Sequence, residues 1–167
     1  RDILSLHDDE IVIGMVSVLR KFKRHDRFIK MIKNVINRNP KKKIKVFIAG
    51  KGPQEEKIKR LISVLNLNAN IQLLGHVENV PQLLRALDIF ILASDSGEGL
   101  SQSLMQALVM ETAVISTNVG STKDLYYDNN FVMIEVNNQK QMNDACDELV
   151  NRSDLRQKYQ KVSRKYV

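Results

Sequence analysis

Glu98, Gly99 and Gln106 are the residues whose types and spacing first suggest a binding site. They belong to the stretch 94–116, SDSGEGLSQSLMQALVMETAVIS, in which an acidic, glycine-bearing turn runs into an apolar helical pattern. We expect that helix to begin at Gly99 and to end at Met110. The first N–H groups of a helix have no intrahelical partner, and together with the helix dipole they attract an anion. Gly99 would let a bulky oxyanion approach this backbone.

The side chains around Gly99 suit a neutral group that carries hydroxyls. Glu98 is too acidic to help bind a phosphate, so we expect it to serve a hydroxylated group beside the anion. Gln106 lies just over two turns into the expected helix, and its amide both donates and accepts, which matches a vicinal diol. Purely structural roles are the alternatives, with Glu98 as a first-turn acid and Gln106 as an ordinary surface amide.

A second group of polar residues follows the first expected strand, in the loop LRKFKRHD. Arg20, Lys21, Lys23 and Arg24 would lie at the same edge of the sheet as Glu98. A guanidinium and an ammonium that converge on a diphosphate would balance its charge. Phosphate at a helix N-terminus, cations opposite and flanking hydroxyl acceptors together indicate a nucleotide-sugar site.

The elements that must position these residues alternate regularly between strand and helix patterns. The expected strands cover residues 11–18, 43–50, 70–77, 88–94, 112–118 and 130–136. The expected helices cover residues 27–39 (with Asp26 as N-cap), 51–67 (with Pro53 in its first turn), 79–87, 99–110, 139–151 and 153–167, with a helical turn at 121–128. This alternation predicts an α/β fold, a doubly wound Rossmann-like parallel sheet of about six strands with helices on both faces. We expect one domain over residues 1–167, of which 1–10 would be the remnant of a linker.

Ligands of such sheets bind at the carboxyl ends of the strands. His76 ends a strand at that edge, so it is a candidate for lining the site. GKGP at 50–53 is a strand-to-helix turn and fits neither the dinucleotide-binding glycine pattern nor a P-loop. His25, at the start of a helix, and Cys146, in the middle of one, are expected to be structural.

The charge of the chain is unevenly distributed. Residues 20–60 contain 16 Lys and Arg against 3 acids, whereas the remainder contains 10 basic and 16 acidic residues. The basic part suggests an anionic partner, although a solvated helix face explains many of these lysines as well. Nucleic acid is not expected as a partner, because aromatic residues make up only 5% of the chain and no binding motif accompanies the charge.

Composition restricts the remaining function classes. A single cysteine excludes an internal disulfide framework and fits a reducing compartment, and the 3 His are too scattered to suggest a metal site. No apolar run approaches the ~18 residues of a membrane span, and no signal peptide opens the chain. We expect a cytoplasmic domain without cofactor or metal. Because the sequence lacks an initiator Met, we expect it to be part of a longer protein.

The motifs, taken in order, resemble the C-terminal, donor-binding domain of the retaining group 1 glycosyltransferases of the GT-B fold. The resemblance begins near Ile11 and runs through IGMVSVLRKFKRHD, FIAGKGPQEEKI, LLGHVENVPQLLRALDIFILASDSGEGLSQSLMQAL and AVISTNVGSTKDL. Each motif alone is a weak signal, but the set at these spacings is specific. The resemblance implies transfer of a sugar, with retention, from a nucleoside diphosphate sugar to a glycan or lipid-linked acceptor, without an obligatory metal.

The resemblance also implies roles for individual residues. Glu98 matches the first of two glutamates eight positions apart and would contact the transferred sugar. Gln106 stands at the second, ribose-binding position, where it keeps hydrogen bonding but loses the charge. The backbone of Gly99, Leu100 and Ser101 matches the segment that meets the donor phosphates.

On the opposite side of the implied site, Lys23 matches the phosphate-binding lysine of the family. The partner arginine of the family falls near Ser17 and Val18, and we expect Arg20 to replace it. The base would lie against Val77, held by backbone and apolar contacts. His76 and Gly50 complete the residues that we expect to bind the donor.

The GT-B fold has a second, N-terminal domain that holds the acceptor and several catalytic groups. By this resemblance the chain alone should bind donor weakly and catalyse little, and either the rest of a longer enzyme or a separate partner would supply that domain. Contact with the inner face of a membrane is a further expectation, since many such acceptors are lipid-linked. Two alternatives are half of a nucleotide-sugar epimerase, whose acid and base groups we do not find, and a non-catalytic nucleotide- or glycan-binding module that docks on an anionic membrane through residues 20–60.

Overall fold

A six-stranded, wholly parallel sheet runs through the protein. The computed structural model describes residues 6–163. The strands are β1 (Glu10–Val16), β2 (Lys43–Ala49), β3 (Ile71–Gly75), β4 (Ile89–Leu92), β5 (Ala113–Thr117) and β6 (Val132–Ile134). Their order is β3-β2-β1-β4-β5-β6, and every neighbouring pair is parallel. The strand order reverses between β1 and β4, which is where ligands bind to sheets of this kind. The predicted doubly wound sheet is confirmed.

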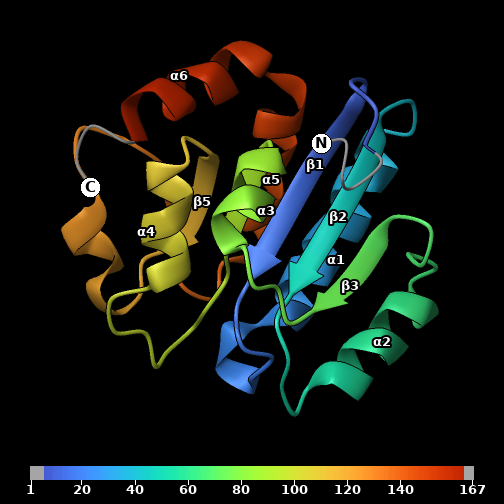
Figure 1. Cartoon of the computed structure of the whole chain (residues 1–167). Helices are drawn as coiled ribbons and strands as arrows, with labels where there is room; N and C mark the ends of the chain where they lie inside the picture. The colour runs from blue at the N-terminus through green and yellow to red at the C-terminus, as the bar shows by residue number, and fades with distance from the viewer. Residues whose placement is uncertain (1–5, 164–167) are drawn as a thin grey trace.

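Helices cover both faces of this sheet (Figure 1). The α-helices are α1 (His25–Arg38), α2 (Glu55–Val64), α3 (Val80–Ala86), α4 (Gln102–Val109), α5 (Gln139–Asn151) and α6 (Ser153–Ser163). Residues 6–163 also contain the short 3-10 helices η2 (Lys21–Lys23) and η3 (Gly120–Leu125). Apolar residues of α1, α2 and α5 form the core on one face, and those of α3 and α4 form the core on the other. Each strand therefore needs apolar side chains in both directions.

The strand sequences supply that two-sided burial. All four residues of β4 and all five of β5 are buried. In β1, Ile13 and Met15 belong to the core under α1, whereas Val12 belongs to the core under α3 and α4. Continuous apolar runs of this kind are typical of parallel strands that are covered on both faces.

Helix α4, which follows Glu98, begins later than the sequence predicts. α4 starts at Gln102, with Ser101 as its N-cap, and the Ser101 side chain accepts a hydrogen bond from the Leu104 N–H at 3.4 Å. The expectation of a helix from Gly99 is therefore wrong, because the serine cap fixes the first turn three residues further on. Gly99 lies in the preceding loop, and Gln106 is just over one turn into the helix.

Two other helix starts also differ from the expected ones. The N-cap of α1 is Arg24, in the left-handed region at φ 54°, and Asp26 lies inside the first turn. The N-cap of α2 is Gln54, so Pro53 precedes the helix. Helix periodicity locates the buried stripe of each helix, but it does not locate the turn at which the backbone first becomes helical.

The expected and observed bounds also differ near the ends of the chain and at the end of β3. Glu10, expected in the linker, is the first residue of β1, and residues 1–5 of that expected linker lie outside the described residues. Residues 164–167 of the last expected helix lie outside them as well. β3 ends at Gly75, so His76 and Val77 are in the loop beyond the strand.

Candidate functional site

A cleft of about 570 Å³ opens where the strand order reverses, at the carboxyl ends of the strands. We call it the switch-point cleft. Its lining includes most of the site residues that the sequence predicts, namely Lys23, Gly50, His76, Val77, Glu98, Leu100, Ser101 and Gln106. These residues come from the loops after β1, β2, β3 and β4 and from the first turns of α4. The topology thus brings together side chains that are up to 83 positions apart between Lys23 and Gln106.

Lys23 and Glu98 form an ion pair inside this cleft. The Lys23 ammonium lies 2.5 Å from Glu98 Oε1, and the two side chains are only 12% and 5% exposed. The Ser94 hydroxyl donates to the same carboxylate oxygen. The Ser94 carbonyl in turn accepts a 2.7 Å hydrogen bond from the Thr117 hydroxyl at the end of β5. A carboxylate so far removed from water requires such partners, and they fix the position of Glu98.

Gly120 packs against the backbone of the loop that carries Glu98. Its φ is +55°, and a Cβ at this position would lie 1.9 Å from the Glu98 carbonyl oxygen. Only glycine therefore allows the start of η3 to approach the Glu98 backbone this closely. We did not assign Gly120 from the sequence, although its place shortly after the fifth strand, at the carboxyl edge, was an available signal.

The opposite wall of the cleft depends on a comparable close approach. Gly50 has φ +133°, and a Cβ there would lie 1.9 Å from the Ser17 carbonyl oxygen. The loops after β1 and β2 are therefore pressed together. Gly99 differs from both glycines, since a Cβ on it would meet no heavy atom of the described chain within 4 Å. The space beside Gly99 is open.

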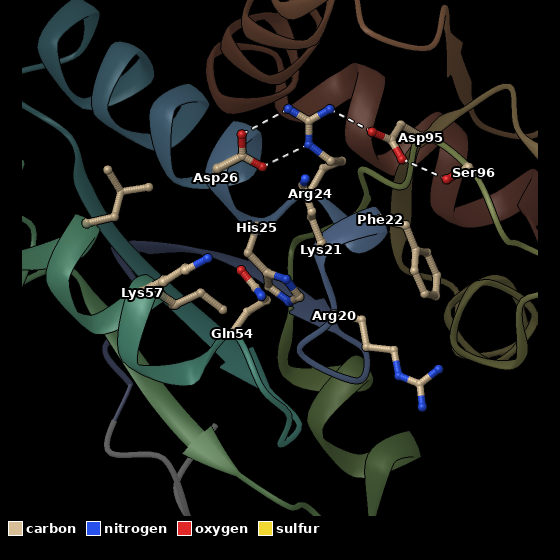
Figure 2. A pocket seen from close by; sticks show the side chains of 12 residues that line it. Arg20, Lys21, Phe22, Arg24, His25, Asp26, Gln54, Lys57, Asp95 and Ser96 are labelled. Carbon is tan, nitrogen blue, oxygen red and sulfur yellow. Dashed lines mark hydrogen bonds and ion pairs between the residues drawn. The ribbon is translucent and has the colours of Figure 1, made fainter.

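Arg24 connects the loops that follow β1, β4 and β6. Its Nε and Nη2 each donate to one oxygen of Asp26 at 2.9 Å, and its Nη1 donates to Asp95 at 2.7 Å and to Asn137 at 3.3 Å. Figure 2 shows the guanidinium between the two carboxylates. The hydrogen bond from Arg24 lowers the pKa of Asp26. Burial raises the pKa of Asp95, but the hydrogen bonds from Arg24 and Ser96 outweigh it, and the net pKa of Asp95 is lowered.

Arg20 does not join Lys23 in the switch-point cleft. It lines a neighbouring cavity of about 660 Å³, which we call the Arg24 cavity and which also includes Lys21, His25 and Lys57. In Figure 2 the Arg20 guanidinium points away from the Arg24 cluster. Arg20 precedes η2 with an extended backbone, at φ −107° and ψ 157°. The expected convergence of Arg20 and Lys23 is therefore not seen.

Lys51 is the cleft residue that sequence reasoning missed. Among the described residues that line the switch-point cleft, the lysine and arginine side chains are Lys23 and Lys51. The signal was present in the sequence, because the GKGP turn follows the second strand at the carboxyl edge. The two glycines of this turn match no phosphate-binding pattern, so the motif by itself assigns no role to the lysine between them.

His25 and Cys146, which we expected to be structural, are both buried. His25 is 3% exposed, and its Nε2 lies 3.2 Å from the Ser17 hydroxyl. Burial is the main cause that lowers the pKa of His25 to about 4, so its imidazole is neutral near pH 7. Cys146 is fully buried in α5, and burial raises the pKa of its thiol. Within residues 6–163, no group of three His, Cys, Asp or Glu could hold a metal ion.

The switch-point cleft thus combines a paired cation and carboxylate, an amide and the capped start of a helix. Such a set can hold an anionic group beside Lys23 and can hydrogen-bond hydroxyls through Glu98 and Gln106.

No helix of the described part of the chain is both long enough and apolar enough to cross a membrane.

Comparison with known families gives a match along nearly the whole chain. The model of the family described as "Glycosyl transferases group 1" matches residues 1–166. Among curated proteins, the N-acetylgalactosamine-N,N'-diacetylbacillosaminyl-diphospho-undecaprenol 4-alpha-N-acetylgalactosaminyltransferase of Campylobacter jejuni is 30% identical over 118 residues, which are 70% of this chain and 32% of that protein. The chain spans between 27% and 41% of the length of the curated relatives that it matches.

Solved structures share the fold. A mutant of TarM from S. aureus, in complex with Fondaparinux, alpha-GlcNAc-glycerol and UDP, superposes with a TM-score of 0.87 at 24% identity, covering 97% of this chain and 33% of that one. The C-terminal domain of a group 1 glycosyl transferase, LpcC, from Francisella tularensis superposes with a TM-score of 0.84 at 24% identity, covering 94% of this chain and 84% of that domain.

Proposed function

The chain belongs to the group 1 glycosyltransferases and corresponds to the C-terminal domain of their GT-B fold, and on this premise we propose that the switch-point cleft binds a nucleoside diphosphate sugar. The observation that carries the proposal is the meeting of Lys23 and Glu98 at the point where the strand order reverses. A cation and a carboxylate side by side match the two ends of a sugar diphosphate, which is anionic at the phosphates and hydroxylated at the sugar.

In this proposal the donor phosphates lie against Lys23 and the backbone of residues 99–101. The open space beside Gly99 allows a phosphate oxygen to approach closely. When a phosphate takes Lys23 as its partner, the Glu98 carboxylate becomes available to the hydroxyls of the sugar. Gln106, one turn further into α4, lines the same cleft and would hydrogen-bond the ribose.

The proposed reaction is transfer of the sugar with retention. As the bond from the sugar to the phosphate breaks, negative charge grows on the departing nucleoside diphosphate, and Lys23 stabilises that charge. The donor phosphate itself can assist in removing the acceptor proton, so no protein base is required from this domain. The acceptor and the other catalytic groups would belong to an N-terminal domain.

The acceptor class is a glycan or a lipid-linked saccharide. The Campylobacter relative acts on a diphospho-undecaprenol acceptor, and the TarM structure contains alpha-GlcNAc-glycerol with UDP. Uridine nucleotides are accordingly the first donors to test. We propose a cytoplasmic enzyme that works at the inner face of a membrane. The exposed Lys41 and Lys42, beside the amino end of β2, are available to anionic lipid there.

Comparing a nucleotide with its sugar conjugate tests this proposal. We expect the chain to bind UDP-sugar more tightly than UDP when both are titrated calorimetrically. Glu98→Ala should remove this difference, while UDP itself binds at least as tightly as before, because Lys23 no longer has a competing carboxylate. Glu98→Gln keeps an acceptor and should keep part of the difference. If Glu98→Ala left the preference for the conjugate unchanged, the sugar would not lie against Glu98.

A further inference from the structure

Lys51 occupies the end of the switch-point cleft that is farthest from Glu98 along the sheet. It lies in the loop after β2 and shares that end of the lining with His76, Val77 and Val80, from the loop after β3 and the start of α3. Its side chain is exposed. No described residue forms an ion pair with it.

Two backbone hydrogen bonds and one close approach fix where Lys51 lies. The Leu19 N–H donates to the Lys51 carbonyl at 3.0 Å, and the Gly50 N–H donates to the Gly75 carbonyl at 2.6 Å. The Lys51 Cε lies 3.7 Å from the place where a Cβ on Gly75 would be. The Lys51 side chain therefore crosses over the last residue of β3. The strand order β3-β2-β1-β4 places it on the other side of β1 from the Glu98 loop.

This end of the cleft suits a flat, partly apolar ring. Val77 and Val80 offer apolar surface, while Lys51 offers a charged donor at the rim. A lysine ammonium has three N–H donors and no acceptor. It therefore favours a ring edge that presents a carbonyl oxygen, and it disfavours an edge that presents an amino group.

On the basis of the proposed function, we propose that Lys51 donates a hydrogen bond to a carbonyl oxygen of the donor nucleobase. With the diphosphate at Lys23 and the sugar at Glu98, the base extends across β1 and β2 toward β3, where Lys51 lies. The cleft consequently selects uracil over cytosine and guanine over adenine. Uracil and cytosine carry a carbonyl and an amino group, respectively, at the same ring position, and they also differ at the neighbouring N3. The comparison of UDP with CDP therefore has to be made in both wild type and Lys51→Met.

The test is calorimetric titration of the chain and of Lys51→Met with UDP and CDP, and with GDP and ADP as a second pair. Methionine keeps the length of the side chain and removes the donor. We expect wild type to prefer the carbonyl-bearing base in at least one pair by about tenfold or more, the effect of one hydrogen bond to a charged group. Lys51→Met should lose that preference by weakening UDP or GDP, while CDP or ADP changes less than about twofold.

The control is Lys158→Met, which removes an exposed lysine of α6 that does not line the switch-point cleft. It should leave all four affinities unchanged. Equal weakening of UDP and CDP by Lys51→Met would place Lys51 at the phosphates and overturn the inference. Wild-type binding without any preference between bases would also overturn it, with the proposed function intact. Absence of all nucleotide binding at millimolar concentration would reject the proposed function as well.

Discussion

Lys23 and Glu98 each neutralise the other at the position where the donor is proposed to bind. The pair is largely buried, and Ser94 adds a hydrogen bond to the same carboxylate oxygen. A diphosphate that binds here therefore replaces Glu98 as the partner of Lys23, because Lys23 is not a free cation. This exchange links the phosphate and sugar contacts, because the carboxylate released from Lys23 is the one that would meet the sugar hydroxyls.

His25 gives the protein a pH-dependent contribution to stability. Burial lowers its pKa from 6.5 to about 4, so the unfolded chain takes up the proton first as the pH falls. The contribution of His25 to the free energy of unfolding is fully present above pH 6.5, and it is lost progressively as the pH falls to about 4. The loss amounts to about 3 kcal/mol from the size of the shift.

His25→Phe keeps a ring in the same volume and does not titrate. We expect its free energy of unfolding, measured by urea denaturation, to fall less steeply than that of wild type between pH 6.5 and pH 4. The pKa values of Asp26 and Asp95 are lowered, so these carboxylates titrate mainly below this range in both proteins. Parallel curves for the two proteins would contradict the lowered pKa of His25.

Single residues of the cleft were predictable from the sequence to different degrees. Lys23, Glu98 and Gln106 follow strands that end at one edge, so their meeting follows from the topology alone. The position of Arg20 does not, because the direction of its side chain depends on the extended backbone before η2. The hydrogen bonds of Arg24 to Asp95 and Asn137 were also unpredictable, since these partners lie 71 and 113 positions away in the sequence.

At the scale of elements, the loop between β4 and α4 is held both by its own serines and by residues of neighbouring loops. Ser101 caps α4, Arg24 holds Asp95, and Gly120 packs against the Glu98 carbonyl. The sequence pattern located the loop correctly but placed the helix start three residues early. A glycine after an acid resembles a helix start as closely as the true serine cap does, and only the backbone geometry distinguishes them.

Gly120→Ala and Gly99→Ala separate support of this loop from ligand contact. Gly120→Ala adds a Cβ against the Glu98 carbonyl at positive φ, and we expect a loss of about 1–3 kcal/mol in the free energy of unfolding. Gly99→Ala meets no described atom within 4 Å, so its stability should change by less than about 0.5 kcal/mol.

Nucleotide binding should distinguish the same two variants in another way. Gly99→Ala should weaken UDP despite its intact stability, because the added methyl occupies the space proposed for a phosphate oxygen. Urea denaturation and calorimetric titration of each variant measure the two effects. A Gly99→Ala protein that binds UDP as wild type does would show that the phosphates do not approach this backbone.

At the scale of the whole molecule, the parallel, doubly wound sheet of six strands was predictable from apolar runs and short connections. The excess of Lys and Arg over acids in residues 20–60 was less informative about an anionic partner than the residue counts suggest. Several cations of the basic segment pair with acids from elsewhere in the chain, for example Lys43 with Asp9, Arg38 with Asp144, and Lys23 with Glu98. A tally along the sequence cannot include such pairs, so it overstates the positive charge that remains for an anionic partner.

The most direct test of the donor cleft is calorimetric titration of the chain with UDP and GDP at low salt, together with Lys23→Ala. Lys21→Ala is the matched control, because its side chain lines the Arg24 cavity instead of the switch-point cleft. We also include Lys23→Ala combined with Glu98→Ala, which avoids leaving the buried carboxylate unpaired.

Wild type and Lys21→Ala should bind one of the two nucleotides saturably and with similar affinity. Lys23→Ala should bind it at least about tenfold more weakly, because a hydrogen bond to a charged group contributes about 1.5–3 kcal/mol. The double variant should remain weak as well. Binding by Lys23→Ala at wild-type affinity would contradict the account, since the diphosphate would then lie somewhere other than at the switch point of the sheet.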